Sequence, residues 1–379
     1  MSIKIAFVGD IMPGGVLNKK PAGVSNEVKK FLQQFDLRIG TLECAIGNIP
    51  TFDPVKMSLK QDVIYAPDSN LDKLIELGID CVSLANNHAF DLGEDGLENT
   101  IAQLNKLGIA YCGAGKNIQE ASKPAILEKN GLKIGIIGLC DNREHTVGYV
   151  PVASKKCAGM NSVSNDYLSQ IYRLRPKVDL LYVVIHWGVE HTFWPDRNML
   201  EFAKECINSG VDGIVGGHQH RIQPLITYKN RPIFLGLGNF LFPPRYLKPP
   251  RPMYYPDDEE DTSDYPVTDE YPWVTQPTYK IWKPLARIGA IGCVEIMDDG
   301  LKNYNMKIVE MTTDNVLVFP DKNPLSKFNQ FELNIVRNSL PDNGKYLLFY
   351  GIKFLSRALR SSAVRSKLLI YKISKVFSH

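Results

Sequence analysis

Short apolar runs separated by helix-like stretches are the feature that most constrains how this chain can fold. The runs lie at Ile3–Val8, Leu37–Leu42, Cys81–Ala85, Lys133–Leu139, Leu180–Ile185, Gly213–Val215 and Ile233–Leu237. Helical patterns stand between several of them, at Asn26–Gln34, Ser69–Leu77, Glu94–Leu107 and Asn198–Ser209. Apolar strands that alternate with amphipathic helices predict a layered α/β fold with much parallel strand pairing.

The bulk composition limits the class of protein. A chain of 379 residues that is 44% hydrophobic can bury a large core, as two domains or as one domain with additions. The net charge of +3 gives no general argument for nucleic acid, and we expect no nucleic-acid partner. Seven cysteines are scattered without zinc-finger spacing, which favours a reducing compartment over a disulfide framework.

The start of the chain reads as a strand rather than as a targeting segment. "MSIKIAFVGD" has no charged stretch followed by an apolar one, so no signal peptide is evident. No stretch reaches the ~18 apolar residues of a membrane-spanning helix. These observations predict a cytoplasmic, soluble protein.

Polar residues stand immediately after six of the apolar runs. They are Asp10, Glu43, the trio Asn86, Asn87 and His88, then His186, the pair His218 and His220, and Asn239. The carboxyl ends of parallel strands share one edge of a sheet, and that edge is where α/β proteins place their sites. Four of the chain's seven histidines occupy such positions.

This set of residue types predicts a metal site. Carboxylates can bridge two divalent ions, imidazoles bind one ion terminally, and an amide oxygen adds a neutral ligand. A single histidine after a strand is more often structural. The number of such residues, and the "GHQH" turn that carries two imidazoles, favour metal binding over that alternative.

The motifs that carry these residues resemble a known family. "GDIM", "LE", "NNHAFDLG", "HWGVE", "GGHQH" and "LGNF" follow one another between Gly9 and Phe240. The set is similar to that of the capsule-synthesis or poly-γ-glutamate-synthesis (CapA-like) family, a branch of the calcineurin-like metallophosphoesterases. The resemblance implies a four-layer αββα sandwich, with residues after about 285 completing the second sheet.

The resemblance also implies a role for each site residue. Asp10, Glu43 and His220 would hold one metal ion. Glu43 would bridge to a second ion, which Asn87, His186 and His218 would also bind. His88 would act as the general acid on the leaving group. Further residues would orient ligands or line the pocket, namely Asn86, Asp91, Glu190 and Asn239. Apart from the resemblance, Arg143 follows the apolar run Lys133–Leu139 and is a candidate to bind an anionic substrate group. For Asp91 the alternative is a charge partner of a helix N-terminus, and for Arg143 it is an ordinary surface loop.

One departure from the wider superfamily concerns the metals. Phosphoesterases of that superfamily carry histidine at the position of Met12, and their bridging aspartate is Glu43 here. The expected cofactors are two divalent ions (Mn, Zn or Fe), or one tightly bound ion if the first site is weak.

Two main functions remain open at this point, and a general nucleotide or sugar-phosphate phosphatase is a third. The first is a binuclear metal-dependent hydrolase, in which a metal-bound hydroxide attacks a phosphoester or an amide during synthesis or processing of an anionic capsule polymer, such as poly-γ-glutamate or a polysaccharide. Its partner would be that polymer or a phosphorylated small molecule. The second is a non-catalytic accessory protein that supports a membrane-bound synthase or exporter.

Two segments differ in amino-acid composition from the rest of the chain. Residues 242–280 are rich in proline, tyrosine and acidic residues, and read equally as a disordered insertion or as a lid beside the site. Residues 326–379 form a basic tail in which Leu348, Ile352 and Leu355 recur at helical spacing. The tail is either a terminal helix packed on the domain of residues 1–325, or a contact with the inner membrane surface or a synthase complex.

Overall fold

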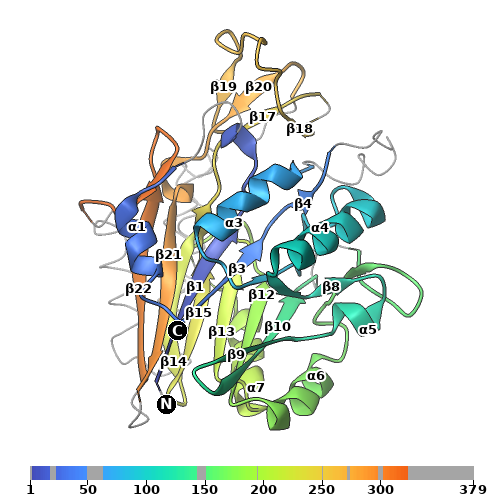
Figure 1. The fold of residues 1–379 in the computed structure, drawn as a ribbon, viewed down its shortest axis with the longest axis vertical. Coiled ribbons are helices and arrows are strands. Elements are labelled where there is room, and N and C mark those ends of the chain that lie inside the picture. Colours follow the sequence, from blue (N-terminus) through green and yellow to red (C-terminus); the bar gives the residue numbers. More distant parts are fainter. Residues whose placement is uncertain are drawn as a thin grey trace, which may run out of the picture. The chain divides into compact units, whose positions relative to one another are not determined.

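Two large β-sheets form the centre of the protein (Figure 1). The computed structural model describes residues 2–17, 23–48, 63–142, 151–193, 195–249, 251–270, 274–297 and 302–322. The predicted tail of residues 326–379 and the predicted site residue Arg143 lie outside these ranges, so the boundary at residue 325 stays a prediction. Within the described residues, no helix combines the length and apolarity needed to cross a membrane.

The first sheet contains the N-terminal strands and the last strands of the domain. Its order is β2 (Gly23–Val24), β23 (Val316–Val318), β22 (Lys302–Met311), β21 (Ile288–Ile296), β1 (Ile3–Ile11), β3 (Leu37–Leu42), β6 (Cys81–Ser83) and β7 (Ala110–Cys112). A further strand, β16 (Asn239–Leu241), pairs with β1. Strands β1, β3, β6 and β7 run parallel, whereas β21 is antiparallel to β1.

The second sheet contains the strands from the middle of the chain. Its order is β14 (Ile222–Tyr228), β15 (Arg231–Leu237), β13 (Gly213–Gly217), β12 (Leu180–His186), β10 (Leu132–Cys140) and β9 (Ala125–Lys129). The four inner strands are parallel, and both edge strands are antiparallel to their neighbours. Every apolar run identified in the sequence is therefore a strand of one of the two large sheets.

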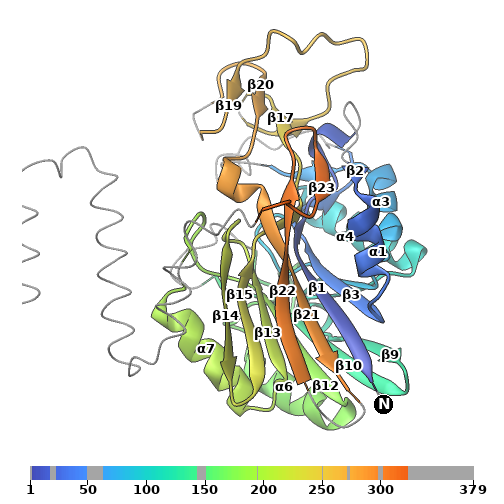
Figure 2. The same ribbon diagram turned by 90° about the vertical axis from the view of Figure 1, so that its left-hand side faces the viewer.

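The two sheets pack face to face, and helices cover their outer faces (Figures 1 and 2). Between the sheets, the ring of Phe7 lies 4.9 Å from Tyr182 and 6.5 Å from Phe234. The first sheet is covered by α1 (Asn26–Leu32), α3 (Asp72–Glu76) and α4 (Gly93–Leu107), and the second by α6 (Tyr167–Leu174) and α7 (Arg197–Asn208). This arrangement confirms the predicted four-layer αββα sandwich.

Local sequence signals explain where individual helices begin and end. Helix α7 begins after Asp196, whose carboxylate accepts a hydrogen bond from the Met199 amide at 2.9 Å. Helix α4 ends at Gly108, which has the left-handed backbone (φ +70°) that a glycine adopts without strain. Buried side chains such as Leu104 on α4 and Phe202 on α7 then bind each helix to its sheet.

One expectation about the later part of the chain is wrong, and the structure does not support one of the two readings of the insertion 242–280. Strands β21, β22 and β23 extend the first sheet through the pairing of β21 with β1, and do not complete the second sheet. The insertion 242–280 is not disordered in its described residues. It forms a small sheet in the order β18 (Met253–Tyr254), β17 (Arg245–Leu247), β20 (Thr278–Lys280) and β19 (Val267–Thr268), which is seen at the top of Figure 1.

Candidate metal centre

Two buried carboxylates from the first sheet form the base of the site. Asp10 lies within β1, because this strand continues to Ile11 instead of ending at Val8 as the sequence suggested. Glu43 directly follows β3. The Asp10 backbone pairs with Thr41 of β3, which brings the two carboxylates to neighbouring positions. Both residues have no exposed surface.

Three histidines from the second sheet face these carboxylates. His186 is the last residue of β12, and His218 and His220 lie in the turn after β13. Both turn histidines have positive φ angles, +93° for His218 and +48° for His220. Non-glycine residues rarely adopt such a backbone, which is found in tight turns and at functional sites.

The carboxylates and histidines form two ligand groups that share Glu43. One group is Asp10, Glu43 and His220, and the other is Glu43, His186 and His218; within each group the candidate ligand atoms lie within 4.8 Å of one another. Glu43 Oε1 lies 3.4 Å from His186 Nε2 and 3.8 Å from His220 Nε2. The division is the one that the family resemblance implied, with Glu43 between two ions.

The hydrogen bonding of the carboxylates fits metal binding. Within the described part of the chain, Asp10 Oδ1 and both carboxylate oxygens of Glu43 are buried and accept no hydrogen bond. Buried polar atoms without partners are costly, and a divalent cation is the partner that two adjacent carboxylates fit best. The other Asp10 oxygen accepts a hydrogen bond from the His218 amide at 3.1 Å, which fixes the carboxylate toward the histidine turn.

The protonation states of these residues follow from their burial. Burial raises the pKa of Asp10 to about 7. Burial, and after it the charge of Asp10, raises the pKa of Glu43 well above its usual range. Burial holds the pKa values of His186 and His220 well below that of a free imidazole, so both rings are neutral, which is the form that binds metal.

The "NNH" segment after β6 contributes to the site in three different ways. Asn86 builds the turn, because its side chain donates to the Leu42 carbonyl at 2.8 Å and accepts from the His88 and Ala89 amides. The Asn87 side-chain oxygen lies 2.8 Å from His186 Nε2, within reach of the second ligand group. The segment therefore brings one amide oxygen to the histidines and leaves His88 beside them.

His88 is held by Asp91. The Asp91 carboxylate lies 2.7 Å from His88 Nδ1 and also accepts the Ile64 amide at 2.7 Å. Because the carboxylate is the acceptor, it fixes the His88 ring and leaves Nε2 as the atom that can exchange a proton. Helix α4 begins two residues later, at Gly93. Asp91 therefore lies before the first turn of the helix, and its carboxylate contacts His88.

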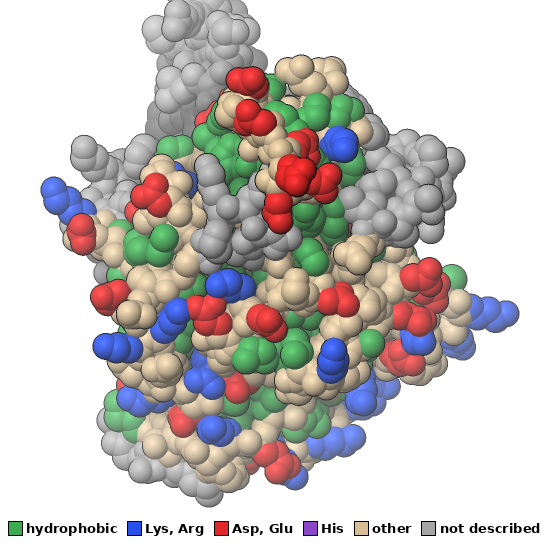
Figure 3. Space-filling view, turned by 45° about the horizontal axis from the view of Figure 1, so that its top comes forward, with side chains coloured by type: hydrophobic (Ala, Val, Ile, Leu, Met, Phe, Trp, Pro, Cys, Tyr) green, Lys and Arg blue, Asp and Glu red, His purple; other side chains and the backbone are tan. Residues whose placement is uncertain are grey.

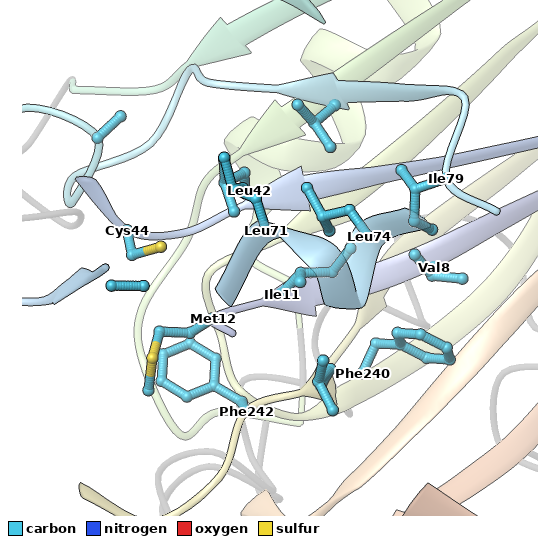
Figure 4. Packing of buried hydrophobic residues seen from close by; sticks show 14 of the residues in the cluster. Val8, Ile11, Met12, Leu42, Cys44, Leu71, Leu74, Ile79, Phe240 and Phe242 are labelled. Carbon is cyan, nitrogen blue, oxygen red and sulfur yellow. The ribbon is translucent and has the colours of Figure 1, made fainter. Parts of the chain in front are cut away.

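The remaining predicted residues lie at different depths. Asn239 Oδ1 is 2.7 Å from His220 Nδ1, and its amide donates to the Ala286 carbonyl at 2.8 Å, so it orients that imidazole. Glu190 lies at the rim, with 41% of its side chain exposed. Met12 is fully buried beside Phe242, and its sulfur accepts the Gly14 amide at 3.1 Å (Figure 4). Met12 thus packs in the core.

Sequence analysis missed five residues beside the site. The His191 ring lies 5.9 Å from that of His220, and burial together with the charges of Arg221 and Lys280 lowers the pKa of His191 to about 4. Trp282 packs 5.0 Å from His220, and Arg245 stacks over Trp282 at 5.1 Å. The sequence features that could have identified such residues are the last histidine of "HWGVEH" and the basic and aromatic residues that follow "LGNF".

Comparison with known proteins agrees with this geometry. Residues 4–244 match the family described as "Bacterial capsule synthesis protein PGA_cap". The chain is 30% identical over 256 residues to the capsule biosynthesis protein CapA of Bacillus anthracis, covering 63% of this chain and 60% of that protein. It is 27% identical over 247 residues to the PGA biosynthesis protein CapA of Bacillus subtilis, covering 63% of each.

A third relative is more distant. A probable polyglutamine synthesis accessory protein of Mycobacterium tuberculosis is 28% identical over 181 residues, which cover 46% of this chain and 47% of that protein. The matches therefore span less than two thirds of the length of each of these relatives. The family match covers more than half of the chain and includes all six candidate metal ligands. The chain belongs to the bacterial capsule synthesis protein family PGA_cap.

Proposed function

We propose that this protein is a metal-dependent hydrolase that acts in the synthesis or processing of an anionic capsule-type polymer. The observation that carries the proposal is the pair of ligand groups that share Glu43, with buried carboxylate oxygens that accept no hydrogen bond from the described residues. Such a buried cluster stabilises the protein poorly by itself, and two ligand groups that share one carboxylate support a two-metal site.

The expected ligand sets are those that the two groups define. Asp10, Glu43 and His220 would hold one divalent ion, and Glu43, Asn87, His186 and His218 the other. Such ions, when bound, supply Lewis acidity that polarises the scissile group and activates water for attack on a phosphoester or an amide.

The protein's own residues position the proton transfer. Asp91 holds His88 through Nδ1 and leaves Nε2 to act as the general acid that would protonate the leaving group. His88 lies close enough to His186 and His220 for its charge to contribute to their lowered pKa values, after burial and the nearer histidines. Asn239 orients His220 in the same way that Asp91 orients His88.

The relatives indicate the polymer. The two Bacillus proteins are described as acting in capsule and PGA biosynthesis, and the mycobacterial protein in polyglutamine synthesis. A polymer of glutamate carries a carboxylate on each repeat and amide bonds between repeats, which suits an amide-cleaving site. We therefore place poly-γ-glutamate first among the substrates, before an anionic polysaccharide or a phosphorylated small molecule.

A hydrolysis assay tests the proposal. The purified chain, supplied with Mn²⁺ or Zn²⁺, is incubated with poly-γ-glutamate and separately with p-nitrophenyl phosphate esters. We expect cleavage of one class that is lost in Glu43→Gln and His88→Ala. The matched control Glu201→Gln, a half-exposed glutamate on α7, should keep full activity. Absence of cleavage of both classes with metal bound would exclude the hydrolase.

A specific observation favours a second candidate, a non-catalytic accessory protein. Met12 occupies the position of a superfamily ligand and packs in the core, so one ligand of the first ion is missing there. The mycobacterial relative is also described as an accessory protein. In cells that make the polymer, this candidate predicts that His218→Ala abolishes polymer formation whereas His88→Ala leaves it unchanged. The hydrolase predicts loss in both.

The location completes the proposal. We place the chain in the cytoplasm, because its seven cysteines are free thiols, and in contact with the inner membrane surface or a synthase through the basic tail. Flotation with anionic liposomes tests the tail: the full chain should float, and a chain ending at residue 340 should not. Equal recovery of both would rule out membrane contact through the tail.

A further inference from the structure

The two ends of the insertion meet at a candidate metal ligand. Phe242 follows β16 at the start of the insertion, and Trp282 follows β20 just past its end. The two rings lie 5.1 Å apart. Both also pack against the imidazole of His220, Phe242 at 5.4 Å and Trp282 at 5.0 Å. Two residues that are distant in the sequence therefore flank the ligand expected for the first ion.

Both flanking rings are buried and anchored. Phe242 is 1% and Trp282 4% exposed, and both belong to the core cluster that contains Met12. Phe242 is fixed because β16 pairs with β1, and the Met12 amide donates to the Leu241 carbonyl at 2.7 Å. Rings in tilted and edge-to-face contacts at these separations attract each other. Neither ring can therefore move without losing contacts to the core and to His220.

The segment that carries Trp282 also holds His220 through a hydrogen bond. Asn239 Oδ1 lies 2.7 Å from His220 Nδ1, and the Asn239 amide nitrogen donates to the Ala286 carbonyl at 2.8 Å. Ala286 ends a short 3-10 turn, Pro284–Ala286, that begins two residues after Trp282. One short segment thus supplies a ring that packs on the imidazole and a carbonyl that orients the hydrogen-bond partner of that imidazole.

These contacts leave one nitrogen of His220 for a metal ion. Nδ1 lies against Asn239, the flanking rings limit the tilt of the imidazole, and Nε2 lies 3.8 Å from Glu43 Oε1. The first ligand group contains only Asp10, Glu43 and His220. With so few ligands, the affinity for the ion depends on how well each is held in place before the ion binds.

The outer part of the insertion differs from its aromatic ends. Five of its acidic residues are exposed, namely Asp257, Asp258, Glu259, Asp261 and Asp264. Figure 3, in which the top of the Figure 1 view comes forward, shows acidic side chains gathered at that end. None of these five belongs to either ligand group found among the described residues. The contact of the insertion with the candidate ligand is therefore aromatic rather than acidic.

We propose that Trp282 is a positioning residue for His220, through which the insertion sets the affinity for the first metal ion. The inference rests on the metal centre of the proposed function, and it adds a residue outside the family match of residues 4–244. Coupling between two sites is reciprocal, so an ion bound at His220 should in turn stabilise the pairing of β17 with β20.

Binding of Mn²⁺ to the full-length chain tests the proposal. Calorimetry measures the dissociation constants, and anomalous diffraction assigns each ion to its ligand group. Trp282→Ala should weaken the ion at His220 about tenfold or more, and the second ion by less than about twofold. Trp282→Phe keeps an aromatic ring and should retain most of the affinity. Tyr265→Ala is the matched control, because Tyr265 packs on Tyr246 within the insertion, and should change neither constant.

A double-mutant cycle separates positioning from a general loss of stability. In His220→Ala, which lacks the ligand, Trp282→Ala should weaken metal binding no further. Equal affinity in the native chain and Trp282→Ala, or a further loss in the His220→Ala background, overturns the proposal. A loss in Trp282→Phe as large as in Trp282→Ala also overturns it. So does a native chain in which no ion binds at His220.

Hydrogen exchange tests the reciprocal effect and does not depend on the folding of Trp282→Ala. Metal loading of the native chain should slow exchange of the β17 and β20 amides, and His220→Ala should abolish this slowing. Exchange of these amides that is unchanged by metal would overturn the proposal. None of these measurements requires hydrolysis. The inference can therefore fail while the proposed function stands, and it can hold even if the chain cleaves neither class of substrate.

Discussion

At the scale of single residues, the unusual feature is a pair of adjacent buried carboxylates. Asp10 and Glu43 are fully buried, and three of their four oxygens accept no hydrogen bond within the described residues. Removing two carboxylates from water without compensation costs several kcal/mol per charge. Protonation relieves this cost in the metal-free protein, as the raised pKa values of both groups indicate. A divalent cation relieves it in the ionised form.

Metal uptake should therefore release protons. The pKa of Asp10 is raised to about 7 and that of Glu43 well above its usual range, so these carboxyls keep protons at a higher pH than free carboxyls do. His186 and His220, with pKa values well below that of a free imidazole, are neutral and have no proton to give. Binding of Mn²⁺ displaces the carboxyl protons, more of them at pH 6 than at pH 8. Calorimetry in two buffers of different ionisation enthalpy measures this number. Uptake of protons, or none exchanged at pH 6, would contradict the assignment.

Asp91 should affect catalysis without holding metal. Asp91→Asn removes the carboxylate that fixes His88 Nδ1, so kcat should fall about 10- to 100-fold while metal content stays unchanged. Asp95→Asn, at an exposed position in the first turn of α4, is the matched control and should have no effect on kcat. If both variants behave alike, Asp91 acts only as a charge near the helix N-terminus.

At the scale of elements, the sequence predicted the inner strands and their polar ends but not how the strands are paired. Runs such as Leu37–Leu42 and Leu180–Ile185 are recognisable because fully buried parallel strands are continuously apolar. The pairing of β21 with β1 is not encoded locally, since an antiparallel strand from residue 288 fits either sheet by its own pattern. The same applies to Asp10, which lies inside β1 because β3 and β16 extend its pairing.

Arg245 and Lys280 of the insertion were missed in the sequence for a related reason. Arg245 and Lys280 are 35 residues apart, and only the pairing of β17 with β20 brings them together. In the sequence, the proline and acidic content of 242–280 dominates and suggests disorder. The candidate ligands, in contrast, were recognisable because each lies at or shortly after the end of an apolar run in the sequence.

Substitution of Gly217, the last residue of β13, should disturb the metal site. A Cβ on Gly217 would lie 2.4 Å from Asp10 Oδ1, so Gly217→Ala must displace the ligand carboxylate. We expect metal affinity to fall by at least tenfold and the free energy of unfolding of the metal-loaded chain to fall by about 1–3 kcal/mol. Gly23→Ala is the control, because a Cβ there meets Val316 only at an ordinary contact distance of 3.5 Å. Equal metal affinity in Gly217→Ala and the native chain would place the ligand group elsewhere.

At the scale of the whole molecule, the candidate ligands come from both sheets. Asp10, Glu43 and Asn87 lie in or after strands of the first sheet, and His186, His218 and His220 in or after strands of the second. In the metal-free protein, the two sets are joined by contacts such as Asn87 Oδ1 to His186 Nε2 at 2.8 Å. Metal binding would therefore connect the two layers of the sandwich through charged ligands.

This connection between the two sheets should raise the melting temperature of the protein when metal is bound. A ligand at a hundred times its dissociation constant stabilises the folded state by about 2.7 kcal/mol, so saturating Mn²⁺ or Zn²⁺ should raise the melting temperature by on the order of 5 °C. Glu43→Gln removes the shared ligand and should abolish the rise, whereas Glu201→Gln should not. A rise of equal size in Glu43→Gln would mean that the ions bind elsewhere.

The most direct test of the central claim is anomalous X-ray diffraction from crystals of the full chain soaked in Mn²⁺ or Zn²⁺. The account predicts metal peaks on both sides of Glu43, one against Asp10 and His220 and the other against His186 and His218, or the latter alone if the ligand missing at Met12 weakens the first site. Crystals of Glu43→Gln should lose these peaks. Peaks only at surface residues, with Asp10 and Glu43 free of metal at saturating concentration, would contradict the account.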